Sequence, residues 1–474
     1  MGRLDTFHWR LLYTPSIIRV NEQQVLTLNM LPSSPMKKNG FQTLLILTLG
    51  IWSVASLLRI IQFTFSPAGA NDLYVYWYAG HFVREDQDPY AAFLTDQKPS
   101  LPIHYLDKTV TDLRDVVVPG WAPAPALTFP LIAILSGFAF LSWPLAKLVW
   151  LGFNLLFIFM IPPLILRIFS PEHRWGRWIT WIFVLVFVGL TSTRYAGSSG
   201  QVTFLVLLLA LGSIYFSKSR PYTAGILLGI ALSKYSLSIG FFLYLLLFER
   251  NYRTTLTALA VQTLGLLGLS IMSGTGVVEI VRGYIFMLVH HSQLEGIHLA
   301  SLFPSKPWEL HIAILLSLIV SIPLLFWYKR NKESISNKQL SPTHRQLLLT
   351  VLSLWALLVG YHRAYDVVLY IIFISLGLQL YRSPEIWSLT KRTQNILLVF
   401  VAITTFFFML PAGSIISDLL PGEIGHAWIL FSVRMTTLIL SAALAITLFL
   451  LFRLRKNHAP VSYTHLTLPT TPYV

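Results

Sequence analysis

Long apolar runs separated by short polar segments dominate the pattern of this 474-residue chain. The first run, residues 41–65, exceeds the about 20 apolar residues that a helix needs to cross a bilayer. Further runs follow at 126–141, 145–166, 178–193, 201–216, 221–248, 254–272, 310–328, 346–361, 367–381, 394–411 and 427–452. This pattern predicts an all-α polytopic membrane protein with about twelve transmembrane helices.

The charges between the runs predict an orientation. Segments 67–125 and 412–425 are acidic, whereas most of the remaining loops are rich in lysine and arginine. Basic loops stay in the cytoplasm under the positive-inside rule. We therefore expect both termini to be cytoplasmic and residues 67–144 to form a large loop on the outer face.

Two apolar runs need a special treatment if the basic loops are all to lie inside. Run 126–141 begins among prolines, and we interpret it as a juxtamembrane helix on the outer face rather than a span. Run 221–248 is interpreted as a short hairpin that crosses twice and turns at residues 233–236, with a single crossing left open as the alternative.

The ends of the chain differ from its apolar part. Residues 1–40 are predicted to be a cytoplasmic tail, 41–452 a single transmembrane domain, and 453–460 a basic cytoplasmic tail. Residues 461–474 are rich in threonine and proline and do not continue the pattern, so we expect them to be non-native read-through.

Composition excludes several classes of protein. With 55% hydrophobic and 12% charged residues, the chain is far more apolar than soluble enzymes are. A net charge of +15 would suggest a nucleic-acid partner in a soluble protein, but here the excess lies in the predicted cytoplasmic loops and orients the protein. The chain has no cysteine, which excludes disulfides and thiolate chemistry.

Candidate chemistry follows the first span, where acidic and aromatic residues alternate. Asp72 precedes a run of tyrosines and a tryptophan that includes Tyr76, and Asp88-Pro89-Tyr90 comes next. A carboxylate at a membrane exit is costly unless it is paired or used, and the aromatic rings and hydroxyls suit sugars. The alternative is an interfacial aromatic belt with a solvated acid.

The order of five motifs over residues 41–452 resembles glycosyltransferase family 87, whose enzymes use polyprenyl-phosphate sugars and have the GT-C fold. The motifs are residues 72–90, the proline-rich segment 121–130, Gly200-Gln201, residues 224–234 and residues 361–366. The chain departs from the family pattern at Ala122 and Ala124, which separate prolines that are usually adjacent, and at Tyr235, where a small residue or proline is common.

The resemblance implies a GT-C-like fold and inverting transfer of a sugar to a lipid or glycan acceptor on the outer face of a bacterial plasma membrane. It also implies mannose as the donor sugar and the catalytic acid of the first outer loop at Asp72. An ionised carboxylate can accept the proton of the acceptor hydroxyl as that hydroxyl attacks the sugar. The leaving polyprenyl phosphate is a stable anion, so no general acid is needed, in contrast to glycoside hydrolysis.

Cations at the predicted outer face are candidates for binding the donor phosphate. They are Lys234, Arg363, His362, Arg194 and Arg59, of which the first three lie inside family-like motifs. Residues expected near the sugar or acceptor are Tyr76, Tyr90, Gln201 and Asp366. For each cation the alternative is simple snorkelling to the headgroups. We predict no cofactor and no metal ligand, although the sequence leaves a divalent-metal requirement open, and the other partners are membrane lipids.

Two other functions remain as alternatives. A multi-span transporter or a flippase for lipid-linked glycans would also have many spans, but it would favour pseudo-symmetric halves and polar residues at the midplane. We find no repeat between the halves of the sequence. A membrane-embedded polymer ligase or structural subunit would share the outer-face chemistry, and the sequence discriminates poorly between it and a glycosyltransferase.

Overall fold

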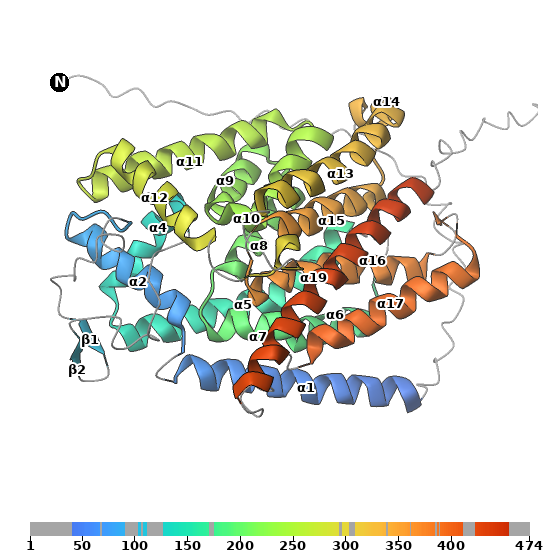
Figure 1. Cartoon of the computed structure of the whole chain (residues 1–474), viewed down its shortest axis with the longest axis horizontal. Helices are drawn as coiled ribbons and strands as arrows, with labels where there is room; N and C mark the ends of the chain where they lie inside the picture. The colour runs from blue at the N-terminus through green and yellow to red at the C-terminus, as the bar shows by residue number, and fades with distance from the viewer. Residues whose placement is uncertain are drawn as a thin grey trace, which may run out of the picture. The chain divides into compact units, whose positions relative to one another are not determined.

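The computed structural model describes most of the chain between residues 40 and 454 (Figure 1). The described ranges are 40–66, 69–90, 103–105, 108–110, 127–169, 175–292, 296–302, 309–337, 340–360, 362–383, 386–387, 389–410 and 422–454. The predicted N-terminal tail and the predicted read-through at 461–474 therefore lie outside the described residues, apart from Gly40.

The chain divides into two compact units, Met1–Leu47 and Thr48–Val474. The described part of the first is the beginning of helix α1 (Gly40–Thr64). All contacts below lie within the second unit.

Helices account for nearly all of the regular structure that is described. Eight of them are long and apolar enough to cross a membrane, and the bent pair α6 (Arg177–Gly189) and α7 (Thr191–Ser198) makes a ninth if it is one span. The eight are in α1, α5 (Trp143–Phe169), the segment Pro221–Phe248, α11 (Tyr252–Met272), α13 (Glu309–Arg330), Ala364–Arg382, α17 (Lys391–Met409) and α19 (Gly422–Arg453). The predicted class, an all-α polytopic membrane protein, is confirmed.

The number of candidate spans in the described residues is lower than the predicted twelve. Helix α8 (Thr203–Phe216) has only 14 residues, and α15 (Pro342–Val359) begins with polar residues. The remaining elements are the helices α12 (Val277–Ser292) and α14 (Lys332–Ser336), the short helix η6 (Leu299–Leu302), and the antiparallel strands β1 (Ile103–Tyr105) and β2 (Lys108–Val110).

The segment Pro221–Phe248 reverses direction, although its length and composition alone make it one apolar stretch of 28 residues. A straight helix of that length would hold its ends about 42 Å apart. Instead both ends contact the same region: Thr254 Oγ1 donates to the carbonyl of Pro221 at 3.1 Å, and Asn251 Nδ2 donates to that of Ser217 at 2.6 Å. The chain therefore turns back between these ends, as the hairpin hypothesis predicts.

The turn lies at η4 (Leu232–Lys234), between α9 (Pro221–Ala231) and α10 (Tyr235–Leu243), which continues into the π-helical turn η5 (Tyr244–Phe248). The arms have 11 residues in α9 and 9 in α10 before the five-residue π-turn. They are therefore about 16 Å and about 21 Å long, short of the about 30 Å apolar core. The predicted apex is confirmed, but neither arm is long enough for a full crossing.

Two glycines fix α9 against α11. A Cβ at Gly225 would lie 2.4 Å from Thr257 Cβ, and one at Gly229 would lie 2.5 Å from Val261 Cβ. Glycines four residues apart share one helix face and let two helices approach closely. Gly225 faces Thr257 and Gly229 faces Val261, so residue numbers rise in the same direction along both helices and α9 and α11 run parallel. Lys234 lies just after the C-terminal end of α9.

Helix α2 (Asn71–Arg84) is almost entirely buried. It packs against η3 (Ser136–Phe140) and α4 (Phe129–Leu135), whose 5 and 7 residues are too few to cross a membrane. The indole of Trp77 donates to the carbonyl of Leu141 at 3.0 Å. The aromatic residues of α2 therefore form core, and the aromatic-belt interpretation does not hold for them.

Candidate active site

The beginning of α2 is bound to the loop after α7 through its backbone. The amide of Ala70 donates to Ser198 O and that of Asp72 to Ser199 O, both at 2.9 Å. Gly200 in this loop has φ 71°, which disfavours any side chain, and a Cβ there would lie 2.7 Å from Leu73 Cβ. The glycine thus lets the two segments touch and places Gln201 beside α2.

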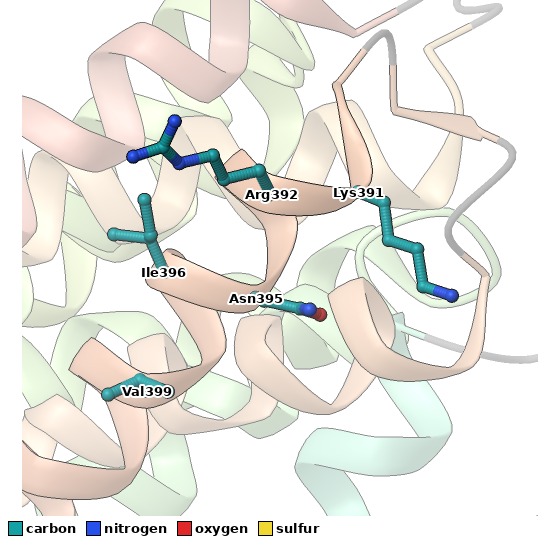
Figure 2. Close-up of a pocket in the computed structure, with 5 residues that line it drawn as sticks. All are labelled: Lys391, Arg392, Asn395, Ile396 and Val399. Atoms are coloured by element: carbon teal, nitrogen blue, oxygen red, sulfur yellow. The ribbon is translucent and has the colours of Figure 1, made fainter.

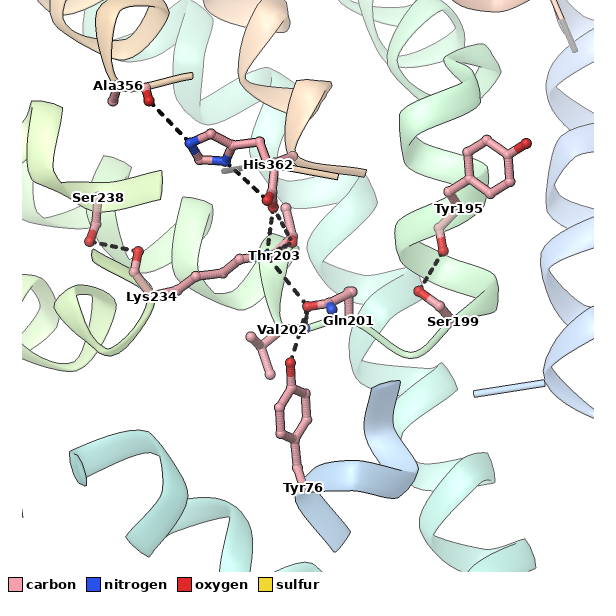
Figure 3. A network of polar contacts seen from close by, with 11 residues as sticks. Tyr76, Tyr195, Ser199, Gln201, Val202, Thr203, Lys234, Ser238, Ala356 and His362 are labelled. Carbon is pink, nitrogen blue, oxygen red and sulfur yellow. Dashed lines mark hydrogen bonds and ion pairs between the residues drawn. The ribbon is translucent and has the colours of Figure 1, made fainter. Parts of the chain in front are cut away.

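Lys234 lies in a buried ion pair (Figure 3). Its Nζ is 2.5 Å from Asp366 Oδ1 and donates to Thr203 Oγ1 at 2.8 Å. The Thr203 hydroxyl in turn donates to the same Asp366 oxygen at 3.1 Å. The ammonium also lies 4.6 Å from the centre of the Tyr365 ring. Partners within the protein therefore surround the Lys234 charge.

Gln201 connects this ion pair to α2. Its Oε1 accepts hydrogen bonds from the Tyr76 hydroxyl at 3.3 Å and from Lys234 Nζ at 3.5 Å (Figure 3). The backbone amide of Val202 donates to the same oxygen at 3.2 Å. One side-chain oxygen thus accepts from three donors, and the amide orientation is determined.

His362 closes the other side of the network and is fully buried. Its Nδ1 lies 3.1 Å from Asp366 Oδ2, and its Nε2 lies 3.1 Å from the carbonyl oxygen of Ala356. Both ring nitrogens of His362 therefore have a polar neighbour, and the Asp366 carboxylate lies between Lys234 and His362.

Asp72 is 7% exposed, and burial raises the pKa of its carboxyl group. The positive charge of Arg363 opposes that shift most strongly, followed by hydrogen bonds with Ser199 and Gln201 and by the charge of Lys234. Burial also raises the pKa of Tyr76 well above its usual value, so the phenol stays a neutral donor. A carboxylate with a raised pKa is a better proton acceptor, provided that it remains ionised.

The network brings together several of the residues singled out in the sequence. Hydrogen bonds and ion pairs join Tyr76, Gln201, Lys234, His362 and Asp366. Asp72 interacts with Arg363 and Lys234 through their charges, which lower the pKa of its carboxyl group. Tyr90 has a different role, because its hydroxyl donates to Leu127 O at 2.7 Å and its ring packs on Tyr284. It anchors the segment before α4, and no contact of Tyr90 with the network is seen in the described residues.

Two of the predicted phosphate ligands lie against α1 instead. The guanidinium of Arg194 is 5.2 Å from the centre of the Trp52 ring and donates to Thr191 at 2.8 Å. Arg59 is exposed and donates to Gln62 at 3.3 Å. The structure therefore does not bring Arg194 and Arg59 into the network.

Two members of the site, the buried Thr203 and the partly buried Tyr365, do not stand out in the sequence. Thr203 opens an apolar helix, and Tyr365 lies within a motif noted only for its charged residues. A hydroxyl two residues after Gln201, at the start of an otherwise apolar helix, is a signal that could have pointed to Thr203.

No group of three or more histidine, aspartate and glutamate side chains that could hold a metal ion is found in the described parts of the chain. A surface hollow of about 550 Å³ lies on α17, lined by Lys391, Arg392, Asn395, Ile396 and Val399 (Figure 2). None of the network residues lines it.

Comparisons with known proteins add one finding. The model of glycosyltransferase family 87 matches residues 127–340, which include Gln201 and Lys234 but neither Asp72 nor Asp366. No curated protein and no solved structure matches the chain. The family match favours an enzyme over a transporter. The match covers less than half of the chain, and together with the apolar helices it supports membership in glycosyltransferase family 87 and therefore a membrane glycosyltransferase.

Proposed function

We propose that this glycosyltransferase moves a sugar from a polyprenyl-phosphate donor to a hydroxyl of a lipid or glycan acceptor, with inversion and with Asp72 as the base. Mannose is the sugar that the family resemblance implies, and the outer face of a bacterial plasma membrane is the expected place. The observation that carries the proposal is a buried carboxylate, Asp72, under the charge of Arg363 and beside a hydrogen-bonded network.

The reaction needs one proton acceptor. The acceptor oxygen forms a bond to the anomeric carbon while the bond from that carbon to the phosphate oxygen breaks. The departing polyprenyl phosphate takes the electron pair, and the hydroxyl proton passes to a carboxylate oxygen of Asp72. Attack opposite to the leaving group in one step inverts the anomeric centre.

The phosphate of the donor needs a cation at the same place. Arg363 is half-buried, and its positive charge lowers the pKa of the Asp72 carboxyl group more than any other charge does, which supports a role for Arg363 near the proposed base. A guanidinium can bind a phosphate through two parallel hydrogen bonds. We assign the primary phosphate contact to Arg363 because its charge acts on Asp72 more strongly than that of Lys234, whose ammonium is paired with Asp366.

The donor class and the base can be tested together. The purified protein in lipid nanodiscs would be given radiolabelled polyprenyl-phosphate mannose, glucose or N-acetylglucosamine, or GDP-mannose, with a bacterial envelope extract as the acceptor source. We expect transfer from a lipid-linked sugar only. Transfer from GDP-mannose alone would contradict the donor class, whereas use of a different lipid-linked sugar would correct only the mannose assignment.

Variants then test the base in the same assay. Asp72→Asn should reduce transfer about 10²–10⁴-fold, the usual contribution of a general base. Asp88→Asn is the matched control, because Asp88 accepts from the backbone amide of Tyr90 at 2.9 Å and asparagine retains that acceptor. Its rate should remain within a few-fold of wild type. An undiminished rate in folded Asp72→Asn would contradict the assignment of Asp72.

A further inference from the structure

Lys234 is poorly placed to bind a substrate directly. Its side chain is 10% exposed and that of Asp366 is 4% exposed. Asp366 Oδ1, Thr203 Oγ1 and Gln201 Oε1 accept from its ammonium, and the Tyr365 ring lies beside it. A phosphate that bound Lys234 would have to displace the Asp366 carboxylate, which is held a second time by His362.

The amide of Gln201 has an acceptor end and a donor end. Its oxygen faces Lys234, Tyr76 and the amide of Val202, all of which donate to it. The donor end therefore points away from these groups. Asp72 is bound through its backbone amide to Ser199, two residues before Gln201. The Gln201 side chain is near enough to lower the pKa of the Asp72 carboxyl group, against the effect of burial.

We infer that Lys234 is a positioning residue: its ion pair with Asp366 fixes the ammonium that holds the oxygen of Gln201, so that the amide N–H of Gln201 faces Asp72. This inference rests on the proposed function, in which Asp72 is the base. Lys234 then acts on the reaction through Gln201 and not through the donor phosphate. Without Lys234, the Gln201 amide can turn its oxygen toward Asp72, which destabilises the ionised form of the carboxylate.

A phosphate ligand and a positioning residue affect different kinetic quantities. Loss of a phosphate ligand raises the donor KM, and any change in the pKa of the base then comes from the lost charge and not from Gln201. Loss of the positioning residue removes a hydrogen bond from the ionised form of Asp72, which raises the pKa of that carboxyl group. The acid limb of the rate profile then moves to higher pH.

The experiment is a double-variant cycle on wild type, Lys234→Met, Gln201→Met and the double variant, each assayed with the polyprenyl-phosphate sugar from pH 4 to pH 9. We expect either single variant to shift the acid limb of kcat/KM upward by about one pH unit or more, with the donor KM within a few-fold. Because both act on one hydrogen bond, the second substitution should add little shift. Gln201→Met retains the Lys234 charge, so it separates the amide from the direct charge effect.

Three results would overturn the inference. The donor KM in Lys234→Met could rise tenfold with the acid limb unmoved, the shifts of the two single variants could add fully, or Gln201→Met could leave the limb in place. If Lys234→Met does not fold, Lys234→Met/Asp366→Asn removes both charges and is tested in the same cycle. Failure of the proposed function itself is recognised separately, because Asp72→Asn would then retain the acid limb.

Discussion

Two buried ion pairs lie at opposite ends of the second hairpin arm, α10 with η5. Lys234 and Asp366 pair just before α10 and connect the hairpin apex to η8 (Ala364–Tyr370). Glu249 and Arg345 pair just after η5, with 3.3 Å between Oε1 and Nε, and connect the hairpin base to α15. Each pair joins segments that are far apart in the sequence.

The polar surroundings of the two pairs differ. In the described contacts, Glu249 also accepts from the Tyr244 hydroxyl at 2.6 Å, and Arg345 also donates to the Leu340 carbonyl. The pair at the apex instead continues through Thr203, Gln201 and His362 toward Asp72. One ion pair braces two helices, whereas the other belongs to a hydrogen-bonded network whose Gln201 lies near Asp72, the proposed base. A buried ion pair is evidence for a site only when its network leads to one.

Removing one cation from each pair should separate their roles. Removing one partner of a buried ion pair costs about 3–5 kcal/mol. Because Asp366 keeps its contact with His362, Lys234→Met should lower the free energy of unfolding by up to about that amount. Arg345→Met should cost less, because the Arg345 side chain is 22% exposed. Transfer per folded molecule should fall about tenfold or more in Lys234→Met and stay within a few-fold in Arg345→Met. Thermal unfolding and the transfer rate, measured on the same preparations, check both expectations.

The double variants are the controls for that comparison. Lys234→Met/Asp366→Asn and Glu249→Gln/Arg345→Met remove both charges and should recover part of the lost stability. Transfer per folded molecule should stay low in Lys234→Met/Asp366→Asn, which still lacks the network, and should be close to wild type in Glu249→Gln/Arg345→Met. Equal losses of activity per folded molecule in Lys234→Met and Arg345→Met would contradict the distinction between a purely structural ion pair and one that belongs to the site.

Two glycines with positive φ provide a second comparison, in which the expected effect on transfer is smaller. Gly200 (φ 71°) adjoins the site, whereas Gly274 (φ 61°) follows α11. Alanine at either position should cost about 1–2 kcal/mol of backbone strain. Only at Gly200 would the new Cβ also clash, 2.7 Å from Leu73, whereas at Gly274 the nearest atom is 3.7 Å away. We expect Gly200→Ala to reduce transfer several-fold more than Gly274→Ala, measured per folded molecule, and equal rates would argue against a tight Gly200–Leu73 contact as a requirement.

The sequence predicted those features that depend on local pattern. The basic loops on both sides of run 221–248 indicated the hairpin, and the prolines before residue 130 indicated a helix that does not cross. The position of Asp72 came from the family resemblance, and its burial beside Gln201 is consistent with it. Its role as the base stays a prediction.

Contacts between residues far apart in the chain could not be predicted from the sequence. Lys234 and Asp366 are 132 residues apart, and nothing local shows which of several cations meets which acid. The direction in which a side chain leaves a helix depends on the rotation of that helix in the bundle. Arg194 therefore appeared suitable for the donor phosphate, although α7 directs it toward Trp52.

The pH dependence of kcat/KM with a polyprenyl-phosphate sugar tests most directly whether Asp72 is the single base. Burial raises the pKa of Asp72, so the carboxylate is lost as pH falls through a value above the ordinary aspartate pKa. The account predicts one acid limb with its midpoint above that ordinary value, no second limb from a general acid near neutral pH, and loss of the acid limb in the residual activity of Asp72→Asn. An acid limb that persists unchanged in Asp72→Asn, or a bell-shaped profile centred near neutral pH, would contradict it.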